Sequence, residues 1–90
     1  RLHDNHPNPF NPSTTIRYEL PSAQRVRLAV YDLTGRLVRI LVNEEWQDTG
    51  EFAVTWDGRD TNGRGVASGV YFYRLRIGEF NDVKKMVVLK

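Results

Sequence analysis

Histidine and serine are the residues with which this sequence could build a metal site or a nucleophilic centre. The two histidines, His3 and His6, lie in a proline-rich opening stretch and have no third nitrogen, sulfur or carboxylate ligand at a recognisable metal spacing. The rest of the chain contains no histidine, so a Ser-His-Asp arrangement cannot be built around Ser13, Ser22 or Ser68. We therefore expect no catalytic residue, no metal site and no cofactor, and we expect these serines to occupy turns.

The loop with the sequence DGRDTNGRG is the best candidate for calcium, because Asp60, Asn62 and Gly63 match part of a calcium-binding loop. If Gly63 is the sharp-turn glycine of such a loop, the first ligand position falls on Gly58 and the bidentate acid position on Gly69. Glycine supplies neither ligand. Asp and Asn side chains that hydrogen-bond to nearby backbone explain the same residues, so we predict a structured turn.

Aromatic residues suggest a third chemistry, the stacking of exposed rings on sugars. The candidates are Tyr31, Trp46, Trp56, Tyr71 and Tyr73. A domain of this size needs Trp56, Phe52, Phe72 and one of the tyrosines to fill its core. Trp46, in a polar stretch, is the one aromatic side chain that we expect to be exposed, and a single ring does not make a sugar platform. Carbohydrate binding remains an alternative function.

Strands must position these residues, because apolar and polar side chains alternate with a period of two along most of the chain. Ile16, Tyr18 and Leu20, for example, alternate with polar residues until Pro21 ends the pattern. We expect strands at 15–20, 26–31, 37–42, 52–56, 70–77 and 83–90, with a short strand or bend at 66–69. The segments 26–31 and 37–42 are expected to form a hairpin whose strands are both central, and the polar segment 43–50 a loop that could hold a helical turn. Such short strands, with turn signals every 8 to 12 residues or so, predict an antiparallel two-sheet sandwich.

The core of this sandwich is predicted from the inward-facing positions, with Trp56 near its centre. Its members are expected to be Ile16, Tyr18, Val26, Leu28, Val30, Leu37, Val54, Trp56, Tyr71, Tyr73 and Leu75. The three prolines in residues 1–12 each remove a backbone donor and favour extended conformations, so we expect this segment to be a linker that leads into a domain formed by residues 13–90.

Composition limits the classes of function. The chain has 90 residues, of which 40% are hydrophobic and 27% charged, and no apolar run approaches the ~20 residues that span a bilayer, so we expect one domain that does not cross a membrane. The net charge of +2, without a visible basic stripe interleaved with aromatic residues, argues against nucleic acid. The chain lacks cysteine, which excludes disulfides and thiolate metal sites. The opening residues contain no apolar core of a signal peptide, so we expect any exported form to be part of a longer protein.

Several sequence blocks together resemble a known family. They are HPNPFNPSTTIRYELP, VRLAVYDLTGRLVRIL, GEFAVTWDG, GVASGVYFYRL and the ending KKMVVLK. From about His6 to Lys90 the chain resembles the type A C-terminal sorting domain of the type IX secretion system, and also the related immunoglobulin-like domain of the flagellar hook capping protein. The hairpin and the WDGRD to YFYRL block are shared by both relatives, whereas PNPFNPSTTI and KKMVVLK point to the sorting domain. One departure is His6, where family members usually have tyrosine.

The resemblance implies an all-β, immunoglobulin-like antiparallel β-sandwich of about seven strands. It further implies a non-catalytic targeting domain that directs a larger exported protein through the type IX secretion system to the cell surface or the medium, with a transient stay in the periplasm. The implied partners are outer-membrane components of the secretion system and a cargo domain upstream on the same chain. We expect a monomer, and a structural role like that of the flagellar scaffold remains an alternative.

The last strand is the segment in which we expect the sorting signal. Its residues are Lys84, Lys85, Met86, Val87, Val88, Leu89 and Lys90. An edge strand can add to a partner's sheet through its backbone while its side chains select the partner, and the lysines would steer it toward an acidic surface. A simpler interpretation is that these lysines protect an edge strand against aggregation.

Overall fold

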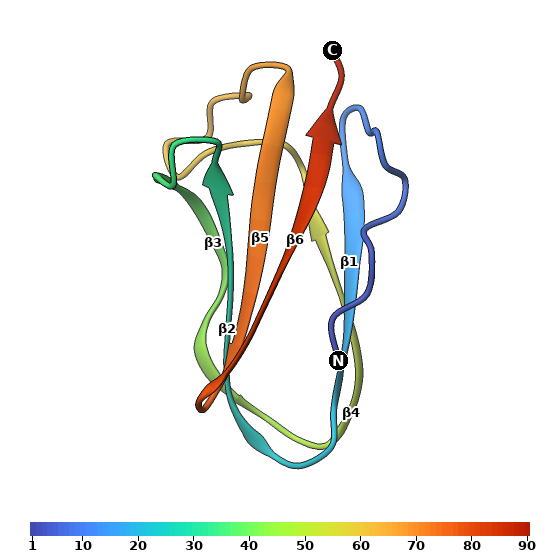
Figure 1. Cartoon of the computed structure of the whole chain (residues 1–90), viewed down its shortest axis with the longest axis vertical. Helices are drawn as coiled ribbons and strands as arrows, with labels where there is room; N and C mark the ends of the chain where they lie inside the picture. Colours follow the sequence, from blue (N-terminus) through green and yellow to red (C-terminus); the bar gives the residue numbers. More distant parts are fainter.

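The computed structural model describes all residues from Arg1 to Lys90 and consists of two antiparallel sheets packed face to face (Figure 1). Its six strands are β1 (Thr14–Leu20), β2 (Gln24–Asp32), β3 (Leu37–Gln47), β4 (Gly50–Trp56), β5 (Gly69–Ile77) and β6 (Phe80–Val88). One sheet has the order β1-β4 and the other has the order β3-β2-β5-β6. The all-β sandwich is confirmed with six strands instead of about seven, because residues 66–68 form no strand and the backbone N–H of Val66 instead bonds to the carbonyl of Gly58 at 2.9 Å.

The hairpin of β2 and β3 is confirmed, but two details of its prediction are wrong. β3 lies at the edge of its sheet instead of the centre, and it continues through the polar segment to Gln47, where a loop was expected. Register shifts between β2 and β3 and a positive φ of 53° at Glu44 show that β3 is bulged. A bulge turns successive side chains partly toward the core, which explains why the apolar run from Leu37 to Val42 does not mark a central strand.

The core lies between the two sheets, and Trp56 is fully buried in it. The ring of Trp56 makes edge contacts with Phe10, at 5.6 Å between centroids, and with Tyr71, at 5.9 Å. The predicted core is confirmed at most positions, but Leu37 is 41% exposed and Val54 is only partly buried. Buried residues that the prediction missed are Leu2, Phe10, Leu20, Val42, Val66, Ile77, Met86 and Val88.

The N-terminal segment, residues 1–12, is packed on the sandwich, whereas we expected a linker. Leu2 and Phe10 are 3% and 2% exposed, and isolated bridges join Leu2 to Tyr18 and His6 to Thr15. Figure 1 shows this dark blue segment running alongside β1. Proline removes a backbone donor but does not prevent the apolar side chains between the prolines from packing. The prolines therefore did not predict whether this segment packs on the domain. The boundary between residues 12 and 13 stays a prediction.

Candidate functional site

β6 carries most of the predicted sorting segment and forms an edge of the four-stranded sheet. Its side chains alternate as expected: Met86 and Val88 are 0% and 1% exposed in the core, whereas Lys85 and Leu89 point to solvent. The expected site is therefore divided. Two of its apolar residues hold the sandwich together, and a partner that meets the folded domain can contact only the others.

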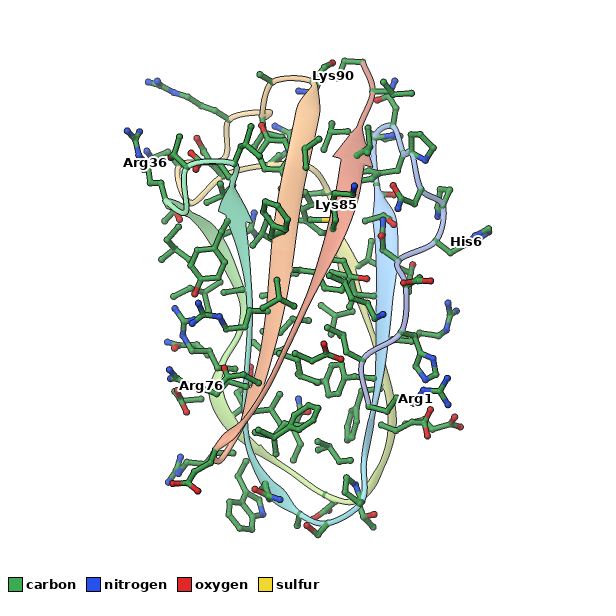
Figure 2. All side chains as sticks on the ribbon, in the orientation of Figure 1. Arg1, His6, Arg36, Arg76, Lys85 and Lys90 are labelled. Carbon is green, nitrogen blue, oxygen red and sulfur yellow. The ribbon has the colours of Figure 1, made fainter.

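The three lysines of the chain all lie in this segment, but the structure does not bring them together. Lys84 faces inward at the edge, where its Nζ lies 3.3 Å from a carboxylate oxygen of Asp4. Lys85 is exposed on the outer face opposite Phe72, and Lys90 lies beyond the end of the strand, with its backbone N–H 3.0 Å from the Ser68 hydroxyl (Figure 2). Among the lysines, Lys85 therefore presents its charge most openly on the face of the strand.

The outward edge of β6 is already occupied near the C-terminus. The N–H of Phe10 donates to the carbonyl of Val87 at 3.1 Å, and the N–H of Leu89 donates to the carbonyl of Phe10 at 3.0 Å. The side-chain carbonyl of Asn8 accepts from the N–H of Val87 at 2.9 Å. The N-terminal segment thus covers the edge groups that a partner strand would need at Val87 and Leu89. A partner strand could pair with Val87 and Leu89 only after displacing the N-terminal segment. The edge of β6 nearer Phe80 has no strand partner.

The DGRDTNGRG loop closes a turn as predicted, but the closing side chains are those of Asp57 and Asp60, and Asn62 takes part through its backbone N–H. The carboxylate of Asp60 accepts from the N–H groups of Asn62 and Arg64 at 2.9 and 3.0 Å. Asp57 bonds the N–H of Arg59 at 3.1 Å and also lies near the guanidinium of Arg39. No group of three or more His, Cys, Asp or Glu side chains is placed to hold a metal ion, and the absence of metal binding stays a prediction.

The β2–β3 hairpin closes with the same turn. The carboxylate of Asp32 accepts from the N–H groups of Thr34 and Arg36 at 2.9 and 3.0 Å, and the Thr34 hydroxyl bonds it as well. These hydrogen bonds, of which the one from the Thr34 hydroxyl has the largest effect, hold the pKa of Asp32 below its ordinary value. Gly35 and Gly63 occupy the corresponding positions of the two turns with φ values of 87° and 81°, a conformation that glycine adopts without strain.

The aromatic candidates for sugar stacking do not share one exposed surface. Trp56 and Tyr73 are fully buried, Tyr71 is 8% exposed, and Tyr31 is half-buried on the outer face of β2. Trp46 is 64% exposed as expected, although it lies in β3 and not in a loop.

Sequence reasoning missed a set of arginines on the outer face of the four-stranded sheet. Arg25 and Arg27 alternate with buried residues of β2, and Arg74 and Arg76 do so in β5. The signal was present as two R-x-R patterns within strands, but it became a cluster only because β2 and β5 are neighbours in the sheet.

The chain forms no helix that is long and apolar enough to cross a membrane. Comparison with curated proteins found no match to the sequence.

Among solved structures, the chain is similar to PorU from Porphyromonas gingivalis, described as a dimeric latent form, with 27% identity and a TM-score of 0.76 over 98% of this chain and 9% of PorU. It is also similar to PorZ from the same organism, with 24% identity and a TM-score of 0.68 over 99% of this chain and 11% of PorZ. For FlgD from P. aeruginosa the identity is 24% and the TM-score 0.64, over 83% of this chain and 58% of FlgD. This chain thus spans a small part of PorU and PorZ and a little over half of FlgD.

The sequence model of the FlgD Ig-like domain matches residues 11–77, which include β1 to β5 and most of the core. The fold, the two sheets and this match agree, and the chain belongs to the FlgD Ig-like domain family.

Proposed function

We propose that this domain is a non-catalytic targeting module that directs a larger exported protein through the type IX secretion system to the cell surface or the medium. The observation that carries the proposal is the extent of the likeness to PorU. The family model ends at residue 77, before β6, whereas the likeness to PorU covers 98% of this chain and so extends into β6. PorZ, which shares the fold, is described as an essential bacterial surface component of the type-IX secretion system.

The positions of the histidines also support a targeting role over a catalytic one. His3 contacts the carboxylate of Glu19 at the surface, and His6 is exposed, so neither adjoins a serine hydroxyl in a protected site. Burial in the core raises the pKa of Tyr73 to about 12. The Tyr73 hydroxyl donates a hydrogen bond to the backbone carbonyl of His3 at 2.8 Å. These groups serve the fold.

The accessible part of the sorting segment is the part that a receptor would read. Lys85 and Leu89 point outward, Lys90 extends past the last strand, and Met86 and Val88 act only through folding. The partners of such a segment would be outer-membrane components of the secretion system, and the cargo would be a domain upstream on the same chain. Charge on Lys85 and Lys90 would steer the encounter toward an acidic receptor surface.

The proposal is tested by fusing residues 1–90 to the C-terminus of a periplasmic reporter in a bacterium that has the secretion system. We expect the reporter at the surface or in the medium, and in the periplasm of an isogenic strain that lacks the outer-membrane translocon. Equal distribution of the reporter in the two strains would refute the proposal.

The signal itself needs variants that leave the core intact. Deleting Met86 to Lys90 removes two core residues and confuses sorting with folding, so the sharper variant combines Lys85→Glu with deletion of Leu89 and Lys90. The matched control is Arg17→Glu, an exposed charge reversal on β1. We expect the first variant to lose delivery while remaining folded, and the control to be delivered. Normal delivery of the first variant would show that the signal lies elsewhere.

A further inference from the structure

The outer face of the four-stranded sheet concentrates positive charge. Its cationic side chains come from β2, β5 and β6, and all of them are exposed or half-exposed: Arg25, Arg27, Arg74, Arg76 and Lys85. We call this set the basic face. Because β2 and β5 are the inner strands of the sheet, their arginines do not protect an edge against aggregation and instead form part of the solvated face of the sheet.

Most of these cations have no carboxylate partner within the molecule. Of the ion pairs in the structure, the one on this face joins Arg76 to Glu44 at the edge of the sheet. Arg25 donates to the backbone carbonyl of Glu44 at 3.3 Å, and Arg27 donates to the hydroxyl of Tyr31 at 2.7 Å. Contacts with neutral oxygens orient the guanidinium groups but leave their charge uncompensated.

The register places two of the arginines in direct opposition. Arg27 of β2 pairs with Arg76 of β5, and Ala29 pairs with Arg74 on the same face. Like charges directly opposite each other destabilise a sheet, typically by a few tenths of a kcal/mol or more. Glu44 compensates Arg76 in part, so the unmatched charge of this pair lies on Arg27, where an anionic partner would neutralise it in the bound state.

Aromatic and aliphatic side chains fill the space between the charges. Phe72 lies between Tyr31 on β2 and Lys85 on β6, and the guanidinium carbon of Arg74 lies 5.2 Å from the centre of the Tyr31 ring. Val83, opposite Arg74, is 50% exposed. Arginine and aromatic residues around exposed aliphatic groups make up the composition of protein–protein interfaces.

We propose that the basic face is the docking surface for a second protein, one that presents aspartate and glutamate side chains around a small apolar patch. Charge complementarity carries the choice of an acidic partner, since arginine forks pair with carboxylates in a bidentate geometry. This surface is separate from the proposed sorting segment except at Lys85, and the inference does not rest on the proposed function.

The rings favour a protein over a single-stranded nucleic acid. Platforms for single-stranded nucleic acids, sheet faces among them, need free aromatic rings on which bases stack. Here one face of Tyr31 is covered by Arg74, and its hydroxyl is occupied by Arg27.

The test is binding of the ¹⁵N-labelled domain to a random copolymer of glutamate and tyrosine, compared with oligothymidylate at the same concentration of negative charge. NMR shift changes report where each probe binds. We expect the copolymer to shift the amides of β2, β5 and β6, and the double variant Arg74→Glu with Arg76→Glu to bind it at least about tenfold more weakly. The matched control, Arg17→Glu with Arg64→Glu, changes the net charge equally on other surfaces and is expected to keep wild-type affinity within about twofold.

Each other outcome counts against the proposal. Tighter binding of oligothymidylate would make the face a nucleic-acid platform, and equal losses in both double variants would reduce the effect to net charge. No binding of the copolymer at low salt would also overturn it. If the Arg74 and Arg76 variant does not fold, Arg25→Glu with Lys85→Glu replaces it, because both of these side chains are exposed and neither has a carboxylate partner.

Discussion

The two sheets bury similar apolar faces against each other, but their outer faces differ. On the β1–β4 sheet, Thr15 opposes Thr55, Arg17 opposes Ala53 and Glu19 opposes Glu51, so this face is polar and carries charges of both signs. On the other sheet, arginines oppose one another around half-buried aromatic rings. A net charge of +2 conceals this difference, because the charge is averaged over the whole chain while a partner meets one face. The inner faces of both sheets stabilise the sandwich, whereas the outer face of the four-stranded sheet is free to bind a partner.

The largest expected effect tests what the two sheets share. Trp56→Ala removes the largest fully buried side chain and its contacts with Phe10 and Tyr71. We expect unfolding to become easier by about 3–5 kcal/mol, a large share of a small domain's stability. Thr55→Ala, one residue away on the outer face, is the control and should stay within about 0.5 kcal/mol of wild type. Melting of the Trp56 variant within a degree or two of wild type would contradict the packing of the two sheets.

The second prediction is that the domain becomes less stable at alkaline pH, because Tyr73 on β5 ionises in the core. Burial raises the pKa of Tyr73 to about 12 from an ordinary value of 10.0. Because the folded state holds this proton more tightly than the unfolded state, the contribution is complete below pH 10 and is lost as the pH rises toward about 12, by on the order of 2 kcal/mol. Urea denaturation across this pH range measures it, with Tyr73→Phe as the control expected to show a smaller decline. An equal decline in both proteins would contradict the assignment to Tyr73.

The N-terminal segment provides a smaller test, at the boundary of the two sheets. Asn8→Ala removes the side-chain acceptor of the Val87 N–H, and we expect a loss of about 1 kcal/mol. Amide exchange at Val87 should accelerate more than exchange at Tyr73. Asn62→Ala changes an exposed amide in a loop and serves as the control. Unchanged exchange at Val87 in the Asn8 variant would show that the segment does not protect this edge.

Added salt tests the repulsion between arginines on the outer face of the four-stranded sheet. Screening weakens both the repulsion between Arg27 and Arg76 and the attraction between Arg76 and Glu44. The part of the salt dependence that is due to Arg27 is expected to raise the free energy of unfolding by a few tenths of a kcal/mol with added NaCl. Arg27→Gln should reduce this dependence, whereas Arg17→Gln on the β1–β4 sheet should leave it as in wild type. The same slope in all three proteins would mean that the opposed arginines carry no measurable strain.

The last prediction is that calcium has no effect on the loop between β4 and β5. The carboxylate of Asp60 already accepts backbone hydrogen bonds within its own turn, and the loop lacks the ligand count for calcium. Thermal unfolding with excess calcium and with a chelator should superimpose. A shift of several degrees between the two curves would overturn the interpretation of Asp60 as a turn residue.

The sequence predicted those parts of the fold in which a local pattern determines the structure. Alternation located the strands, and the Asp and Gly residues of the DGRDTNGRG loop located its turn. It failed where pairing between distant segments decides: β3 as an edge strand, Phe10 in the core and the neighbouring positions of Arg27 and Arg76 all depend on which strands meet. The sorting segment was chosen by resemblance, and its division into buried Met86 and exposed Lys85 followed from the strand period.

The bridge between Phe10 and the end of β6 also decides how the domain responds to pulling. The N-terminal segment runs parallel to β6 there, and Arg1 and Lys90 lie toward opposite ends of the long axis (Figure 1). Tension between a cargo on one side of the domain and an anchor on the other would drag these two segments past each other lengthwise. Bonds that lie across the direction of pull share such a shearing load, whereas a strand peeled from its end breaks them one by one. The hydrogen bonds at Asn8 and Phe10 would therefore resist unfolding of the domain under tension.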